Sequence, residues 1–96
     1  MRHVEEETKH IALLLKMLAN ENRLMILCAL MEGPKSVSDL AKRVPNITQS
    51  ALSQHLTLLK SQRILDFCKY GQSITYSIAD GRVIEIIMAL KKNYDE

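Results

Sequence analysis

The sequence predicts a mainly α-helical domain with one small β-hairpin near its C-terminal end. Apolar residues recur at helical spacing over most of the chain, and between residues 64 and 78 the apolar pattern shortens to a period of two. The chain has 96 residues, of which 47% are hydrophobic and 25% charged, enough for one core under an ordinary polar surface. We therefore expect residues 1–96 to form a single domain.

Composition excludes several other classes of protein. The longest apolar run, from Leu24 to Met31, is eight residues long, and a bilayer needs about 20. The first residues are polar and acidic, unlike a secretion signal. Two cysteines argue against a disulfide scaffold and favour the cytoplasm. With three histidines and no glycine-rich phosphate loop, we expect neither an enzyme nor a bound cofactor.

Two helices are predicted at the start of the chain. Over residues 5–19 two apolar stripes lie on different sides of one helix. Asn20 can cap both the end of this helix and the start of the next, at residues 21–31, whose apolar character places it in the core. Gly33 and Pro34 end the second helix. The two stripes of the first helix are Ile11, Leu14, Leu15 and Leu18, and Leu13 with Met17.

Two further helices follow after short connections. Ser36 begins a capping-box pattern, and the apolar spacing after it predicts a short helix over residues 36–44. Residues 45–47 predict a turn, and Thr48 can then cap a helix over residues 49–62.

The outer face of the 49–62 helix carries amides, hydroxyls and one imidazole, with no carboxylate. Solvated helix faces usually mix Glu with Lys, whereas phosphates and base edges are read by uncharged polar groups and cations. The inward stripe consists of Ala51, Leu52, Leu56, Leu58 and Leu59. The outer residues are Gln49, Ser50, Ser53, Gln54, His55 and Thr57.

The segment of period two predicts a β-hairpin. Its strands are residues 64–69 and 74–78, and Gly71 supplies the positive φ of a turn over residues 70–72. Lys69 and Gln72 are then expected at the hairpin tip, and Cys68 is expected to point outward.

The last predicted helix covers residues 81–94 and begins after Asp80, which can cap it. It has two apolar stripes, like the helix over residues 5–19, and together these faces exceed what 96 residues can cover. The stripes consist of Val83, Ile86, Ile87 and Leu90, and of Ile84 and Met88.

Charge is concentrated in the middle of the chain. Residues 35–69 contain six basic and two acidic side chains, a net charge of +4, whereas the segments before and after each carry −1. This distribution fits a polyanionic partner, but a solvated basic face without a partner explains the charge equally well.

The element order predicts a helix-turn-helix, formed by the third and fourth helices, followed by a hairpin that serves as a wing. In this context residues 18–27, 38–41, 48–56 and 74–78 resemble the ArsR/SmtB family of winged helix-turn-helix repressors. The segment from Ser50 to Leu56 is the most specific of them. The resemblance covers about residues 10–94.

This resemblance implies a homodimer joined by helices 5–19 and 81–94. It also implies that a recognition helix, 48–62, enters the major groove of double-stranded DNA beside the wing, 64–78. The protein would then bind a palindromic operator and repress transcription until an inducer binds. Gln54 can pair with adenine, and residues at the helix N-terminus can meet phosphate. The predicted DNA-binding residues are Thr48, Gln49, Ser50, Ser53, Gln54, His55, Lys60, Arg63, Lys69 and Gln72.

Several residues depart from patterns of the family. Relatives that bind metal through Cys-x-Cys have these cysteines where Ser36 and Ser38 stand here, and the last helix has no His, so no metal site is expected. Arg63 stands where the family usually has Gly.

Cys28 matches one of two cysteines in the thiol-sensing BigR/HlyU-like subgroup, but the second position is Asp95 here. Cys28 is therefore a candidate thiol sensor or, as we favour, a small buried hydrophobe. The sequence does not specify the operator or the inducer. It also leaves open whether Cys68 is redox-active and whether the protein represses or activates transcription. The alternative function is a winged-helix module that docks other proteins without binding DNA.

Overall fold

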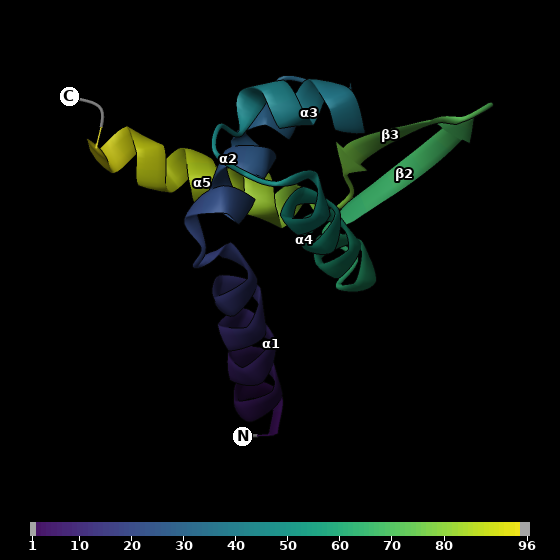
Figure 1. Ribbon diagram of the computed structural model, residues 1–96. Helices are drawn as coiled ribbons and strands as arrows, with labels where there is room; N and C mark the ends of the chain where they lie inside the picture. Colours follow the sequence, from purple (N-terminus) through teal and green to yellow (C-terminus); the bar gives the residue numbers. More distant parts are fainter. Residues whose placement is uncertain (1, 95–96) are drawn as a thin grey trace.

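The computed structural model describes residues 2–94, which form five helices and one small antiparallel sheet (Figure 1). The domain has the predicted winged-helix arrangement, with α1 projecting from the body and the hairpin extending on another side. The elements are α1 (Arg2–Leu18), α2 (Glu21–Leu30), β1 (Lys35–Ser36), α3 (Val37–Arg43), α4 (Gln49–Ser61), β2 (Leu65–Tyr70), β3 (Ser73–Ile78) and α5 (Gly81–Tyr94).

The predicted N-terminal helix caps are confirmed, whereas Asn20 has an extended backbone (φ −156°) and not the left-handed conformation of a C-terminal cap. The side chain of Asn20 accepts the Arg23 backbone N–H (3.1 Å), that of Ser36 accepts the Asp39 N–H (3.2 Å), and that of Thr48 accepts the N–H of Ala51 (3.0 Å). Each bond satisfies a donor that the first turn of a helix leaves free. At α5, the Asp80 carboxylate accepts the Arg82 backbone N–H at 3.0 Å.

Helix boundaries differ from prediction by one to three residues. The first helix starts at Arg2 rather than Glu5, which suits acidic residues near a helix N-terminus. The second ends at Leu30, and the third is shorter by one residue at each end, because Ser36 and Val44 are its caps. The predicted bounds of the last helix are confirmed.

The sheet corrects two predictions. Lys35 and Ser36 form a third strand, β1, which pairs with β3 and was not expected. Tyr70 pairs with Ser73, so the hairpin turn consists of Gly71 and Gln72 rather than residues 70–72. Gly71 has φ +61°, and positive φ at the first turn position is the arrangement of a type II′ turn, which matches the twist of the strands.

The junction between α4 and β2 is a Schellman motif centred on Arg63, with φ 61°. The Arg63 N–H donates to the carbonyl oxygen of Lys60 (3.0 Å), and the Ile64 N–H donates to that of Leu59 (3.0 Å). Arginine therefore occupies a left-handed position that glycine adopts without strain.

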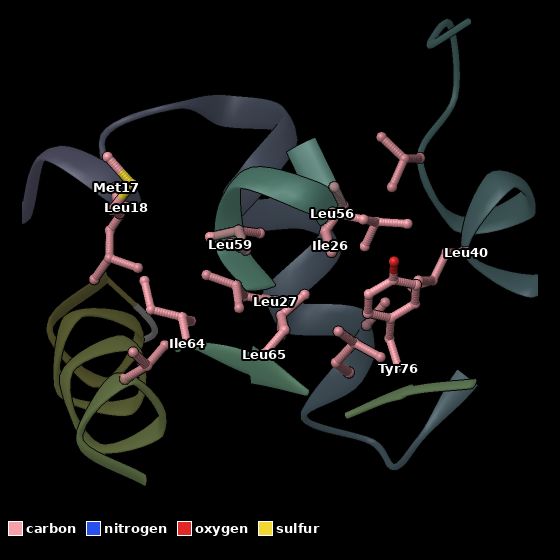
Figure 2. Close-up of a cluster of buried hydrophobic side chains, with 14 of the residues drawn as sticks. Met17, Leu18, Ile26, Leu27, Leu40, Leu56, Leu59, Ile64, Leu65 and Tyr76 are labelled. Carbon is pink, nitrogen blue, oxygen red and sulfur yellow. The ribbon is translucent and has the colours of Figure 1, made fainter. Parts of the chain in front are cut away.

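The core lies between α2, α4, the base of the hairpin and α5. In Figure 2, Leu56 and Leu59 of α4 lie beside Ile26 and Leu27 of α2, and all four are at most 1% exposed. The core holds α4 by its inward side, which fixes the orientation of its other side. Around these side chains the core also contains Met17, Leu18, Leu40, Val44, Leu52, Ile64, Leu65, Tyr76, Val83 and Ile87.

Candidate nucleic-acid interface

The face of α4 opposite the core is exposed and contains no charged carboxylate. Ser50, Gln54 and Thr57 are exposed in successive turns, with Ser53 and Gln49 on one flank. Within residues 2–94 the side chains of these five residues form no intramolecular hydrogen bond, so their donors and acceptors are available to a partner. Leu58, predicted to face inward, is only half-buried and borders this face.

Thr48 has a structural task at the start of this helix. Its Oγ1 accepts the Ala51 N–H, which leaves the hydroxyl proton free to donate. The side chain is exposed, so capping and a phosphate contact are compatible.

His55 lies to the side of the polar face rather than within it. It is half-buried, and its Nδ1 lies 3.5 Å from Nη1 of Arg23 in α2. Burial, followed by the positive charge of Arg23, lowers the pKa of the His55 imidazole. The imidazole of His55 is therefore held against Arg23 on the flank of α4, unlike the solvent-facing side chain that the sequence suggested.

The start of α4 and the hairpin turn border a common groove of about 660 Å³. Gln49 and Gln72, which the sequence placed in separate elements, line this groove together with Ser36, Ser38 and Ser73. Lys69 is exposed but lies within β2, opposite Ile74, and not at the tip. The amides of helix and wing therefore lie on one side of the domain.

Ion pairs neutralise half of the six basic residues in the middle of the chain. Glu32 pairs with Lys35 (3.5 Å) and with both terminal nitrogens of Arg43, whose hydrogen bonds hold the pKa of Glu32 below its ordinary value. Lys60 lies 3.9 Å from Asp66 and 5.3 Å from the centre of the Phe67 ring.

Lys42, Arg63 and Lys69 form no ion pair within residues 2–94. Their charge remains available to phosphates, and long cationic side chains are the usual phosphate contacts. Lys42, in the last turn of α3, was counted only in the charge balance of the sequence. Nothing in its local pattern distinguished it from the paired cations, since pairing depends on Glu32 and Asp66.

The two outer helices expose apolar side chains, as the doubled stripes predicted. On α5, Met88 is 57% and Leu90 53% exposed, although Val83 and Ile87 of the same helix are buried. On α1 the exposed side chains come from both stripes, while Met17 and Leu18 pack on the core. The exposed members on α1 are Val4, Ile11, Leu13 and Leu15.

Among the described residues, neither Cys28 nor Cys68 forms a disulfide or belongs to a cluster of metal ligands. Cys28 is free, half-buried and packed against the core, and Cys68 is free and exposed, as predicted for its strand position. Asp95, at the second position of the thiol-sensing subgroup, lies outside the described residues. Within residues 2–94 no three His, Cys, Asp or Glu side chains cluster as metal ligands. No helix of this part is long and apolar enough to cross a bilayer.

A helix-turn-helix whose second helix presents an acid-free polar face beside a two-stranded wing defines a winged helix-turn-helix DNA-binding protein. The family model described as "Bacterial regulatory protein, arsR family" matches residues 20–66. A curated relative, the transcriptional activator HlyU of Vibrio cholerae, is 35% identical over 98% of this chain and 86% of its own length. The chain belongs to the ArsR family of bacterial transcriptional regulators.

Three further comparisons agree with this assignment. The biofilm growth-associated repressor of Agrobacterium fabrum is 36% identical over 91% of this chain and 74% of its own length. The structure of reduced HlyU from Vibrio cholerae superposes with a TM-score of 0.89 and 34% identity, covering 100% of both chains. A structure described as a homodimeric winged helix-turn-helix DNA-binding domain, from Mycobacterium bovis, has a TM-score of 0.84 and 26% identity over 100% of this chain and 88% of its own.

Proposed function

We propose that this regulator acts as a homodimer that binds a palindromic DNA operator through α4 and the wing. The observation that carries the proposal is the outer face of α4, which the core turns toward solvent and which contains free amides and hydroxyls but no carboxylate. A merely solvated helix face would be expected to carry paired acids and bases.

The residues of this face have different proposed roles. Gln54 extends from the centre of the face and reads a base by a bidentate contact, while Ser50 and Ser53 accept or donate at neighbouring bases. Thr48 and Gln49 lie at the N-terminus of α4, where the helix dipole and free N–H groups favour phosphate.

The wing and the junction between α4 and β2 are proposed to contact the DNA backbone. Lys69 and Arg63 form no ion pair with any described residue, and Gln72 lies in the hairpin turn, so these three are the proposed contacts to phosphate or to the minor groove. Lys60 is partly engaged by Asp66, and we assign it a weaker phosphate contact.

The second copy of the chain covers the exposed apolar faces of α1 and α5. A patch of this kind on a small regulatory protein marks an interface, and the homodimeric domain from Mycobacterium bovis has the same fold. In a two-fold dimer the two copies of α4 read half-sites about 34 Å apart, one turn of DNA.

Occupation of the operator is proposed to block transcription, since a relative of 36% identity is a repressor. The related HlyU is an activator, so a reporter-gene assay is needed to distinguish repression from activation. The site of action is the cytoplasm, and no enzymatic step is part of the proposal. An inducer is left open; Cys28, half-buried in α2, is the candidate if the inducer acts on a thiol.

The proposal is tested by selecting duplexes from a random pool with the purified protein. We expect an enriched palindrome, bound by two chains per duplex, whose affinity falls steeply with rising salt. The same selected site placed upstream of a reporter gives lower expression when the protein is present. A protein that enriches no sequence and binds no duplex in dilute buffer would instead be the protein-docking module.

A further inference from the structure

The last turn of α1 is closed by a side chain from α2. The Nε of Arg23 donates to the carbonyl oxygen of Met17 (2.6 Å), and its Nη2 donates to that of Lys16 (3.3 Å). The final carbonyls of a helix lack partners within it. Those of Leu15 and Leu18 accept backbone N–H groups of the connection, and Arg23 satisfies the two between them.

The same guanidinium contacts the recognition helix. Its Nη1 lies 3.5 Å from Nδ1 of His55, which is 32 residues further along the chain and lies in the middle of α4. Arg23 is itself fixed, because its backbone N–H donates to the side chain of Asn20. One planar group therefore joins the end of α1 to the flank of α4.

The chemistry of this contact determines the state of the imidazole. A guanidinium has only donors, so Nδ1 of His55 must be the acceptor and the ring proton must be on Nε2. From α2 the charged group that acts on His55 is Arg23, and from α1 the cluster contains the carbonyl oxygens of Lys16 and Met17. A protonated ring would lose the acceptor and face a like charge.

We propose that Arg23 is a positioning residue for DNA binding, which holds α4 at a fixed angle to the end of α1 through the neutral imidazole of His55. The proposal rests on the proposed function, in which α1 joins the two chains and α4 reads the bases. Two copies of α4 must meet half-sites at one spacing. A change in their angle to α1 therefore weakens the specific site and leaves the general attraction of cations to phosphate unchanged.

The test uses substitutions matched to the two ring nitrogens. His55→Asn places an amide oxygen close to the position of Nδ1, whereas His55→Gln places it close to that of Nε2. Arg23→Lys keeps the charge but cannot donate in three fixed directions. Affinity is measured for a duplex selected by the wild-type protein and for a random duplex.

We expect Arg23→Lys and His55→Gln to lower affinity for the selected duplex roughly fivefold or more. His55→Asn should bind the selected duplex more tightly than His55→Gln, and Arg23→Lys should bind the random duplex like the wild type. In the wild-type protein, ¹⁵N NMR of the ring should show Nδ1 without a proton and Nε2 with one. A merely structural role of Arg23 would weaken binding to both duplexes alike, so a loss confined to the selected duplex, together with the Asn-versus-Gln difference, distinguishes positioning from stability.

Two results would overturn the positioning role while leaving DNA binding intact. These are a proton on Nδ1 of His55 in the NMR spectrum, or equal affinities of His55→Asn and His55→Gln for the selected duplex. Failure of the wild-type protein to select any duplex would instead overturn the proposed function. Thermal melting of each variant shows whether it is folded. The NMR measurement on His55 uses the wild-type protein, so it does not depend on the folding of any variant.

Discussion

Replacement of Lys69 by alanine should reduce the salt dependence of DNA binding by a calculable amount. Lys69 is exposed on β2 and forms no ion pair within residues 2–94, so its removal leaves no carboxylate unpaired. Removal of Lys60, in contrast, would release Asp66. Lys69→Ala therefore removes one free charge per chain.

Each phosphate neutralised contributes about 0.9 to the slope of log affinity against log salt concentration. Two copies of Lys69 in a dimer therefore contribute about 1.8 to this slope. Between about 50 and 200 mM salt, the affinity advantage of the wild-type protein over Lys69→Ala should shrink roughly tenfold. The loss should be the same for selected and random duplexes, because phosphates carry no base identity.

The assay is a fluorescence anisotropy titration of both duplexes at four salt concentrations. Lys91→Ala is the matched control: it removes the same side chain from the last turn of α5, at the end of that helix far from the wing (Figure 1). We expect its slope to equal that of the wild type. An unchanged slope for Lys69→Ala, or an equal change for Lys91→Ala, would show that the wing does not neutralise phosphate.

Three further predictions concern single side chains. Gln54→Ala should cost about 2 kcal/mol or more of discrimination between selected and random duplexes, counted over two half-sites; equal losses on both duplexes would contradict base readout. Arg63→Gly should raise the free energy of unfolding by about 1 kcal/mol in urea titrations, because glycine removes the strain at φ 61°; a similar gain in Arg63→Ala would mean that charge, not backbone strain, is responsible. The folded-state pKa of His55 lies below its ordinary value, so the neutral ring contributes to stability above roughly pH 6.5, and this contribution is lost as pH falls through the lowered pKa. The wild-type protein should therefore lose more free energy of unfolding than His55→Asn between about pH 7 and pH 5. Parallel curves of unfolding free energy against pH for the two proteins would exclude this linkage.

Local chemistry explains what could be predicted about the fold. The caps at Asn20, Ser36 and Thr48 are bonds to residues three positions away, so a short sequence window contains both partners. The helices follow from apolar spacing, and the polar face of α4 follows from the same spacing. The helix-turn-helix, the wing and most of the candidate interface were therefore predictable.

Contacts between distant segments account for the errors. β1 exists only because Lys35 and Ser36 lie beside β3, and two residues contain no strand pattern of their own. The hairpin turn is shorter than predicted because Tyr70 and Ser73 pair across the strands.

From the sequence alone one could determine which surfaces exist: an acid-free polar helix face, a wing, and two terminal helices with more apolar surface than the domain buries. Only the tertiary structure decided which groups on those surfaces are free. It pairs Lys35 and Arg43 with Glu32, brings Lys60 near Asp66, and turns His55 toward Arg23. The physical reason is that periodicity is a property of one segment, whereas the partner of a charge or a ring nitrogen depends on where separate segments meet.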